Sequence, residues 1–397
     1  MATCGRKWFA AIVCLLLCTQ LTSCTAKTLP DTMAQSIPAP ESTAQPLEQQ
    51  AQPTDIGLEQ VVRAVEPVAE QLNKTLGEHD SPTRPQYYKL VDAAAKLGVP
   101  VGFDSADLRN HQPVIDFCNA FKAGKDAQVA LYSIDTDGVN QYYFEVRGGQ
   151  MTHTTRHWIF GMDVPDYAIT ETLDDLDLWD NGWMVWHPND EGGMTSSYMG
   201  MRVVPLGEEA YELLETYVYH LSSDHTGVTS RNWSEQDMSR LNWDFVFEAL
   251  LNREGGDLAS YGAGGMVIDS PDSFSVPAAD AEERLTSYFP ITAEQLRQLP
   301  AYHADTQTYE FWGFRGGGYS PIIEVTQKVD NPDGSFTLRI DLTAPEFNQE
   351  HVSTSYLTIL PDGHGGYRYM GNQTDSKRGN DPAWGEGLEN KGAWQVE

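Results

Sequence analysis

The feature of this sequence that most restricts its fold is a strict alternation of apolar and polar residues in two separate segments. In SFTLRIDL, residues 335–342, every second side chain is apolar, and VNQYYFEVR, residues 139–147, follows the same period. This period is typical of a β-strand with one face on a core and the other in water. Each segment follows a turn sequence, Asp-Gly at 137–138 and Asn-Pro-Asp-Gly at 331–334, and a second turn sequence, Gly-Gly at 148–149, follows the first segment. The two segments therefore predict antiparallel hairpins.

Amphipathic helices are predicted ahead of the strands in both halves of the chain. Apolar residues fall at helical spacing in 58–76 and again in 206–221. The segments Ser234–Asp237 and Thr292–Gln295 resemble capping boxes that open further helices. The sequence therefore predicts an α+β fold in which helices are followed by an antiparallel β-meander, in two successive modules.

A secretory signal peptide is predicted at the N-terminus. Two basic residues precede an apolar run at 8–18, which is shorter than the roughly 20 apolar residues that a membrane-spanning helix needs. Leu-Thr-Ser-Cys at 21–24 is similar to the lipobox of bacterial lipoproteins. In such signals the thiol of Cys24 receives a diacylglyceryl group, and this cysteine becomes the first residue of the mature protein. Ordinary secretion with cleavage after Ala26 is the alternative.

Lipidation of Cys24 implies a membrane anchor and an extracytoplasmic location on the cell membrane, because two acyl chains hold a protein stably on a bilayer. The segment that follows is rich in Pro, Ala, Gln, Ser and Thr, and this composition predicts a disordered tether that cannot bury a core. We therefore divide the sequence into a signal peptide at 1–23, the lipidated cysteine and tether at 24–57, an N-terminal α+β module at 58–205, a C-terminal α+β module at 206–375 and an extended tail at 376–397.

The cysteine content limits which disulfides the chain can form, and its charge limits which partners it can bind. Three of the five cysteines lie in the signal peptide, so lipidation of Cys24 would leave Cys118 without a partner for a disulfide. Apolar neighbours predict that Cys118 is a buried small hydrophobic residue rather than a catalytic thiol. With 57 acidic against 26 basic residues, the net charge is −31. Such a surface repels nucleic acid, so we predict no nucleic-acid partner.

Three longer segments carry a family resemblance. They are RVVPLGEEAYELLETYVY at 202–219, FPITAEQLRQLPAYHADTQTYEF at 289–311 and NPDGSFTLRIDL at 331–342. Through them the chain resembles an uncharacterised family of bacterial lipoproteins that is known only as a domain of unknown function. None of these segments is a catalytic motif. The resemblance therefore implies export and family membership, but no activity, cofactor or site residue.

Neither the histidines nor the acidic clusters match a metal-binding motif. His153 and His157 are expected on one strand, where their rings share a face but lie about 13 Å apart, too far to bind one ion. The acidic clusters at 135–137 and 174–180 lack the register of an EF-hand loop, and hairpin turns account for both. We predict no metal site and no cofactor, with calcium at these clusters as the alternative.

Aromatic residues give the clearest indication of a binding site. Trp312, Phe314 and Tyr319 surround a run of glycines in EFWGFRGGGY, and aromatic faces beside polar groups bind sugars and peptides well. We interpret these three residues as a ligand-binding site. The tryptophans of WDNGWMVWHP, at 179, 183 and 186, are expected to pack on a core face of their strands.

The sequence favours a non-catalytic protein that binds an extracellular glycan, peptide or protein ligand. Neither a nucleophile elbow nor a phosphate-binding loop is present. The alternative is a cell-surface hydrolase that acts on glycan or peptide polymers. A shallow groove or a sheet edge would favour binding, whereas a deep cleft with convergent carboxylates would favour hydrolysis.

The predicted anchor can be tested by replacing the lipidated cysteine. We expect Cys24→Ala to release the protein into the medium or to leave its precursor uncleaved, because the thioether to the lipid cannot form. Fractionation of cells and mass spectrometry of the purified N-terminus measure both outcomes. A variant that is processed normally and stays in the membrane fraction would exclude lipidation at Cys24.

Overall fold

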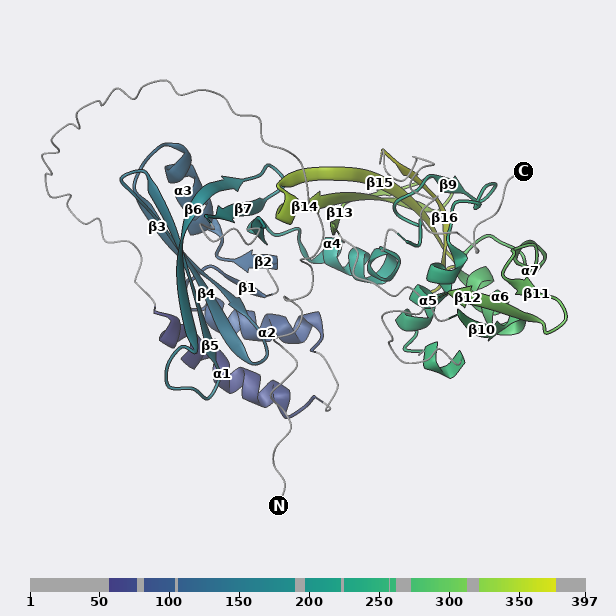
Figure 1. The fold of residues 1–397 in the computed structure, drawn as a ribbon, viewed down its shortest axis with the longest axis horizontal. Coiled ribbons are helices and arrows are strands. Elements are labelled where there is room, and N and C mark those ends of the chain that lie inside the picture. The colour runs from purple at the N-terminus through teal and green to yellow at the C-terminus, as the bar shows by residue number, and fades with distance from the viewer. Residues whose placement is uncertain are drawn as a thin grey trace, which may run out of the picture. The chain divides into compact units, whose positions relative to one another are not determined.

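The computed structural model describes residues 57–76, 82–103, 106–189, 197–222, 225–256, 258–261, 273–312 and 321–375. These residues form the α+β fold that the sequence predicts (Figure 1). The predicted signal peptide, Cys24, the tether and the tail at 376–397 lie outside them. Within the described part of the chain, no helix is both long enough and apolar enough to cross a membrane.

An eight-stranded sheet organises the first half of the chain. Its strand order is β2-β1-β3-β4-β5-β6-β7-β8, and neighbouring strands are antiparallel except β1 and β3, which are parallel. Strands β3 to β8 therefore follow one another as a meander. The bounds are β1 Val101–Phe103, β2 Ala106–Arg109, β3 Ala127–Ile134, β4 Gly138–Arg147, β5 Gln150–Ile159, β6 Tyr167–Leu178, β7 Trp183–Pro188 and β8 Met199–Arg202.

Helices cover both faces of this sheet. On one face, α1 (Leu58–Asn73) and α2 (Arg84–Ala95) bury their apolar stripes against side chains of β1, β3 and β4. On the other face, α3 (Gln112–Lys122) packs on a second core that includes Trp186 of β7. Cys118 of α3 is fully buried in that core, as the sequence predicts, and burial raises the pKa of its thiol to about 12.

The sheet curves until its two edge strands, β2 and β8, contact each other, so it forms a nearly closed barrel. Sheet twist accumulates over several strands and favours this closure. The tryptophans at 179, 183 and 186 are all buried within or beside this sheet, which confirms that they pack on a core.

The second half holds two further sheets and several helices. A five-stranded sheet has the order β13-β14-β15-β16-β9, and a three-stranded sheet has the order β10-β12-β11. The helices are α4 Glu208–Leu213, α5 Trp243–Arg253, α6 Ala278–Tyr288 and α7 Ala293–Leu296. The strands are β9 Trp233–Ser234, β10 Ser273–Pro277, β11 Tyr302–His303, β12 Thr308–Trp312, β13 Ile322–Asp330, β14 Phe336–Ala344, β15 Gln349–Pro361 and β16 Tyr367–Thr374.

The predicted elements of the second half are partly confirmed. The alternating segment forms β14, and its apolar side chains are buried. Thr292 and Gln295 form the predicted capping box of α7. The predicted box at Ser234–Asp237 is wrong: Ser234 ends β9, and its backbone exchanges hydrogen bonds with that of Asp237 in a tight turn. The helix expected there begins later, at Trp243.

The helix predicted at 206–221 changes its winding after α4. It continues as a π-helical turn, Leu214–Val218, and ends as a 3₁₀ turn, Tyr219–Leu221. Tyr367 and Tyr369 of β16 donate their hydroxyl hydrogens to the carbonyls of Thr216 and Tyr217, at 2.9 and 2.8 Å. These bonds satisfy carbonyls at a place where the regular α-helical pattern is lost, which explains why the wider turn is stable there.

A buried ion pair joins β8 of the first half to β13 of the second. The guanidinium of Arg202 donates to both carboxylate oxygens of Glu324, at 2.5 and 2.6 Å, and both side chains are about 95% buried. The indole N–H of Trp183 donates a third hydrogen bond to Glu324, at 2.8 Å. Burial raises the pKa of Glu324, whereas Arg202 lowers it.

A second polar cluster lies at the edge strand β2. The buried carboxylate of Asp107 accepts hydrogen bonds from the hydroxyls of Tyr88 and Tyr211, each at 2.8 Å. Asp107 has a positive φ of 52°, which costs a non-glycine residue about 1–3 kcal/mol. Arg84 stacks on the ring of Tyr211 and pairs with Glu215 at 2.6 Å. These bonds hold Asp107 in a backbone conformation that it would not adopt alone.

The buried ion pair predicts a large difference between single and double substitutions. We expect Arg202→Met to lower the free energy of unfolding by about 3–5 kcal/mol, because Glu324 stays buried without an opposite charge. The double variant Arg202→Met/Glu324→Leu should recover most of this loss, since no buried charge remains. Urea denaturation of the three proteins, followed by tryptophan fluorescence, measures the difference. If the single and the double variant were equally stable, Arg202 and Glu324 would not form a buried ion pair.

Candidate functional site

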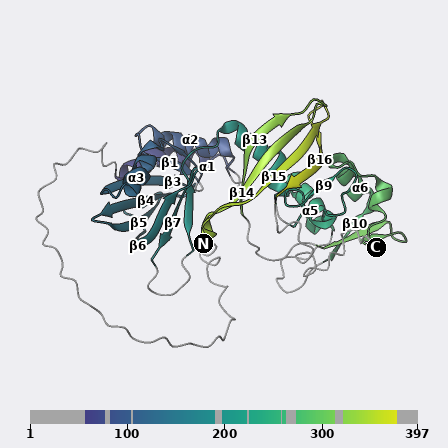
Figure 2. The same cartoon turned by 90° about the horizontal axis from the view of Figure 1, so that it is seen from above.

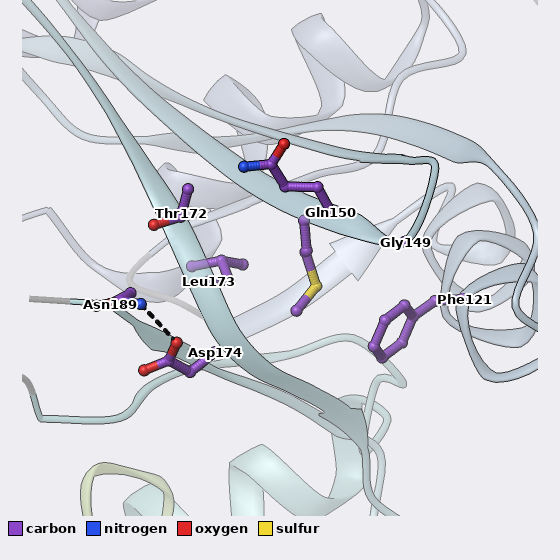
Figure 3. Close-up of a pocket in the computed structure, with 8 residues that line it drawn as sticks. Phe121, Gly149, Gln150, Thr172, Leu173, Asp174 and Asn189 are labelled. Atoms are coloured by element: carbon purple, nitrogen blue, oxygen red, sulfur yellow. Dashed lines mark hydrogen bonds between the residues drawn. The ribbon is translucent and has the colours of Figure 1, made fainter. Parts of the chain in front are cut away.

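A surface hollow of about 460 Å³ lies at one end of the eight-stranded sheet (Figure 3). It forms where the last turn of α3, the β4–β5 turn, the middle of β6 and the residue after β7 meet. Pockets that bind small molecules have volumes of about 300–1,000 Å³. The hollow is therefore large enough for a sugar ring or for a few residues of a peptide.

The floor of the hollow is apolar. It consists of Phe121, Met151 and Leu173, which continue the core under α3 to the surface. Met151 and Leu173 are buried, whereas Phe121 is half-buried and leaves part of its ring accessible. An accessible aromatic ring beside aliphatic side chains offers a flat apolar contact to a ligand.

The rim of the hollow is polar. It consists of Gln150, Thr172, Asp174 and Asn189, all of which are exposed. Together they offer hydroxyl, amide and carboxylate groups, which can both donate and accept hydrogen bonds. Asp174 is the only ionisable residue among the described residues that line the hollow.

Two glycines shape the wall between β4 and β5. Gly148 and Gly149 have positive φ angles of 58° and 82°, as the central residues of a tight hairpin turn require. The turn starts β5 at Gln150, so that Gln150 reaches the rim and the next residue, Met151, reaches the floor. The Gly-Gly pair in the sequence predicts this turn.

A β-bulge directs Asp174 towards the hollow. Leu173 pairs with Pro188 and Asp175 pairs with His187, so Asp174 is an extra residue in β6 without a partner in β7. Bulges of this kind redirect a side chain and are common beside functional sites. The amide of Asn189 donates to Asp174 at 2.8 Å and orients its carboxylate (Figure 3).

Of the sequence-predicted aromatic site, the structure describes only Trp312. This residue ends β12 and is half-buried, and its backbone N–H donates to the carboxylate of Asp244 at 3.2 Å. Phe314 and Tyr319 lie outside the described residues. The aromatic site therefore stays a prediction, and Trp312 contributes no side chain to the hollow in the first half.

Asp244 is a buried acid that sequence analysis missed. It lies in the first turn of α5 and is 5% exposed, and burial raises the pKa of its carboxyl to about 7. One of its oxygens has no hydrogen-bond partner among the described residues. Its apolar neighbours in the segment WDFVF were the only available signal, and a weak one, because an acid in the first turn of a helix is common and is rarely buried.

The two histidines of β5 have different surroundings. His153 is buried among Phe144, Tyr142 and Trp186, and this burial lowers its pKa to about 4. The Nδ1 atom of His157 instead lies 2.8 Å from a carboxylate oxygen of Asp166. Across the described ranges, no group of three or more His, Cys, Asp or Glu side chains is placed to hold a metal ion.

Comparison with known proteins identifies the family but not the activity. The family of unknown function DUF6070 matches residues 59–386, and the chain therefore belongs to this family. No curated protein and no solved structure matches the chain. The function must therefore be argued from the geometry of the site.

The raised pKa of Asp244 predicts a pH-dependent stability. An acid whose pKa is higher in the folded than in the unfolded state stabilises the fold at low pH, and this contribution is lost as pH rises through about 7. We expect Asp244→Asn to be more stable than the wild type at pH 8 by about 2–4 kcal/mol, with a much smaller difference at pH 5. Urea denaturation at both pH values measures this.

Asp237→Asn provides the control for this experiment. Hydrogen bonds from Ser239 lower the pKa of Asp237, so its substitution should change stability equally at pH 5 and pH 8. A stability difference between wild type and Asp244→Asn that does not depend on pH would show that Asp244 is not a buried acid with a raised pKa.

Proposed function

We propose that this member of the DUF6070 family is an extracytoplasmic, membrane-anchored protein that binds an extracellular polar ligand, a glycan or a peptide, in the hollow beside Asp174. The proposal rests on the pairing of an apolar floor with a polar rim. Phe121 and Leu173 can pack against the apolar part of a ligand, while Asp174 and Asn189 bind its polar groups. Sugars and peptides both combine these two kinds of surface.

The bulge in β6 is the observation that carries the proposal. A regular strand would pair Asp174 with β7 or direct it elsewhere, whereas the bulge places its carboxylate at the rim. Asn189 holds one carboxylate oxygen, and the other lies 3.8 Å from Nδ1 of His187. The orientation of the acid is therefore fixed by neighbours before any ligand arrives, which reduces the entropy that binding costs.

Binding is favoured over hydrolysis by the composition of the rim. Hydrolysis of a glycosidic bond by the usual mechanism needs two carboxyl groups on opposite sides of the bond. Asp174 is the single carboxylate among the described residues that line the hollow. The hollow is also open to solvent rather than enclosed, and this shape can hold part of a longer polymer.

The proposed location gives this binding activity a context. A tether after Cys24 would let the folded part stand away from the membrane to which two acyl chains hold it. The net charge of −31 would keep the folded part away from anionic surfaces. A ligand would then be taken from the surroundings of the cell rather than from the bilayer itself.

The proposal can be tested with glycan and peptide arrays and matched substitutions. We expect Phe121→Ala to weaken binding of an array-selected ligand by about tenfold or more, because it removes the aromatic contact. Asp174→Asn should also weaken binding of this ligand, because it removes the negative charge at the rim. Phe347→Ala and Asp305→Asn replace an exposed aromatic residue and an exposed acid of the second half, both outside the lining.

The two control variants should bind as the wild type does. If Phe121→Ala and Asp174→Asn also bind their selected ligand with unchanged affinity, the hollow is not the binding site. A ligand that the protein cleaves during the assay would support the hydrolase alternative.

A further inference from the structure

The first half of β6 has a free edge among the described residues. Residues 167–172 pair with β5 on one side, whereas β7 pairs only with residues 173–178. Figure 2 shows β6 as the strand that follows β5 in the sheet, next to β7. A strand with one unpaired edge presents backbone N–H and C=O groups that can pair with another chain.

The identity of the outward-facing groups follows from one hydrogen bond. The backbone N–H of Asn189, directly after β7, donates to the carbonyl of Thr172 at 2.8 Å. Thr172 therefore directs its backbone groups away from β5. Because successive residues of a strand direct these groups to alternate edges, Ala168 and Thr170 present theirs on the free edge.

This edge leads into the hollow. Thr172, whose carbonyl accepts the N–H of Asn189, borders the free segment, and it also belongs to the rim, next to Leu173 of the floor. Every residue from 167 to 172 is exposed, including Tyr167 and Ile169, which are 41% and 54% exposed. A ligand strand along the edge would therefore contact apolar side chains and end beside Asn189 at the rim of the hollow.

The charges around this edge select among possible occupants. Glu171 lies on the free segment, and Asp174 and Asp175 follow it along β6. Among the described residues, Glu171 and Asp175 form no ion pair. A second copy of this chain would bring the same acids to the same edge and be repelled. A basic chain would instead find opposite charges there.

We infer that an extended basic peptide segment of a partner protein binds as an additional strand on the free edge of β6, with one end in the hollow. Backbone hydrogen bonds to Ala168 and Thr170 hold the strand, and its alternate side chains contact Tyr167 and Ile169. Lysine or arginine side chains of the peptide pair with Glu171 and Asp175. This inference rests on the proposed function and names peptide, rather than glycan, as the ligand class.

The test uses a fluorescein-labelled peptide of alternating lysine and valine, with binding to the full folded chain measured by fluorescence anisotropy. We expect Ala168→Pro to weaken binding by about tenfold or more, because it removes an N–H that the added strand needs. Since this N–H faces the free edge, proline costs no bond to β5. Ala168→Val, which keeps the N–H, is the matched control and should bind normally.

Two changes test the edge and its charge separately. A lysine–valine peptide that is N-methylated at alternate residues keeps its charge but cannot form the ladder, so it should bind at least about tenfold more weakly, even if the proline variant fails to fold. A glutamate–valine peptide should not bind, and Glu171→Gln should weaken binding of the basic peptide more at low than at high salt.

These outcomes separate the inference from the proposed function. Equal affinities of the methylated and unmethylated peptides would overturn strand addition. Absence of lysine–valine binding, together with a glycan that binds wild type but not Phe121→Ala, would overturn the inference and leave the hollow as a binding site. Peptide binding that Ala168→Pro abolishes and Phe121→Ala leaves unchanged would support the edge and remove the hollow from the site.

Discussion

The buried ion pair between Arg202 and Glu324 is the interaction on which the union of the two halves depends. Two charges removed from water are costly unless each finds its partner, and here the partners come from strands more than a hundred residues apart in sequence. The pair is therefore satisfied in one arrangement of β8 and β13, and alternatives leave a buried charge. Asp107 adds a second constraint of the same kind, because its carboxylate needs Tyr211 from the second half.

The sequence predicts elements whose signal is local. The alternation in β14, the Gly-Gly turn after β4 and the capping box at Thr292 each depend on neighbours in the chain, and all three are confirmed. The capping box predicted at Ser234 was wrong because a short polar run is compatible with a turn as well as with the start of a helix. The local sequence does not distinguish the two. The π-helical turn could not be predicted, because its carbonyls are satisfied by Tyr367 and Tyr369, about 150 residues away.

The candidate site shows the same limit more strongly. Asp174 stands in an acidic cluster whose residues look equivalent in the sequence, and only the pairing with β7 makes it the bulged residue. A bulge depends on how two strands pair, so the alternation of apolar and polar residues in one strand cannot reveal it. Aromatic content instead pointed to Trp312, Phe314 and Tyr319, of which the structure describes Trp312 alone. The floor residues Met151 and Leu173 looked like ordinary core positions, which they also are.

The free edge of β6 differs from an ordinary protected edge in a way that bears on its use. Proteins usually protect exposed edges with lysine, proline, bulges or a covering segment. The edge strand β13 follows this rule, since it carries Lys328 and a register shift between Val325 and Gln327. Residues 167–172 contain neither lysine nor proline, and the bulge of β6 lies beyond them. Among the described residues, acidic side chains are the remaining protection, and they repel a second acidic copy while leaving the backbone groups accessible to a basic strand.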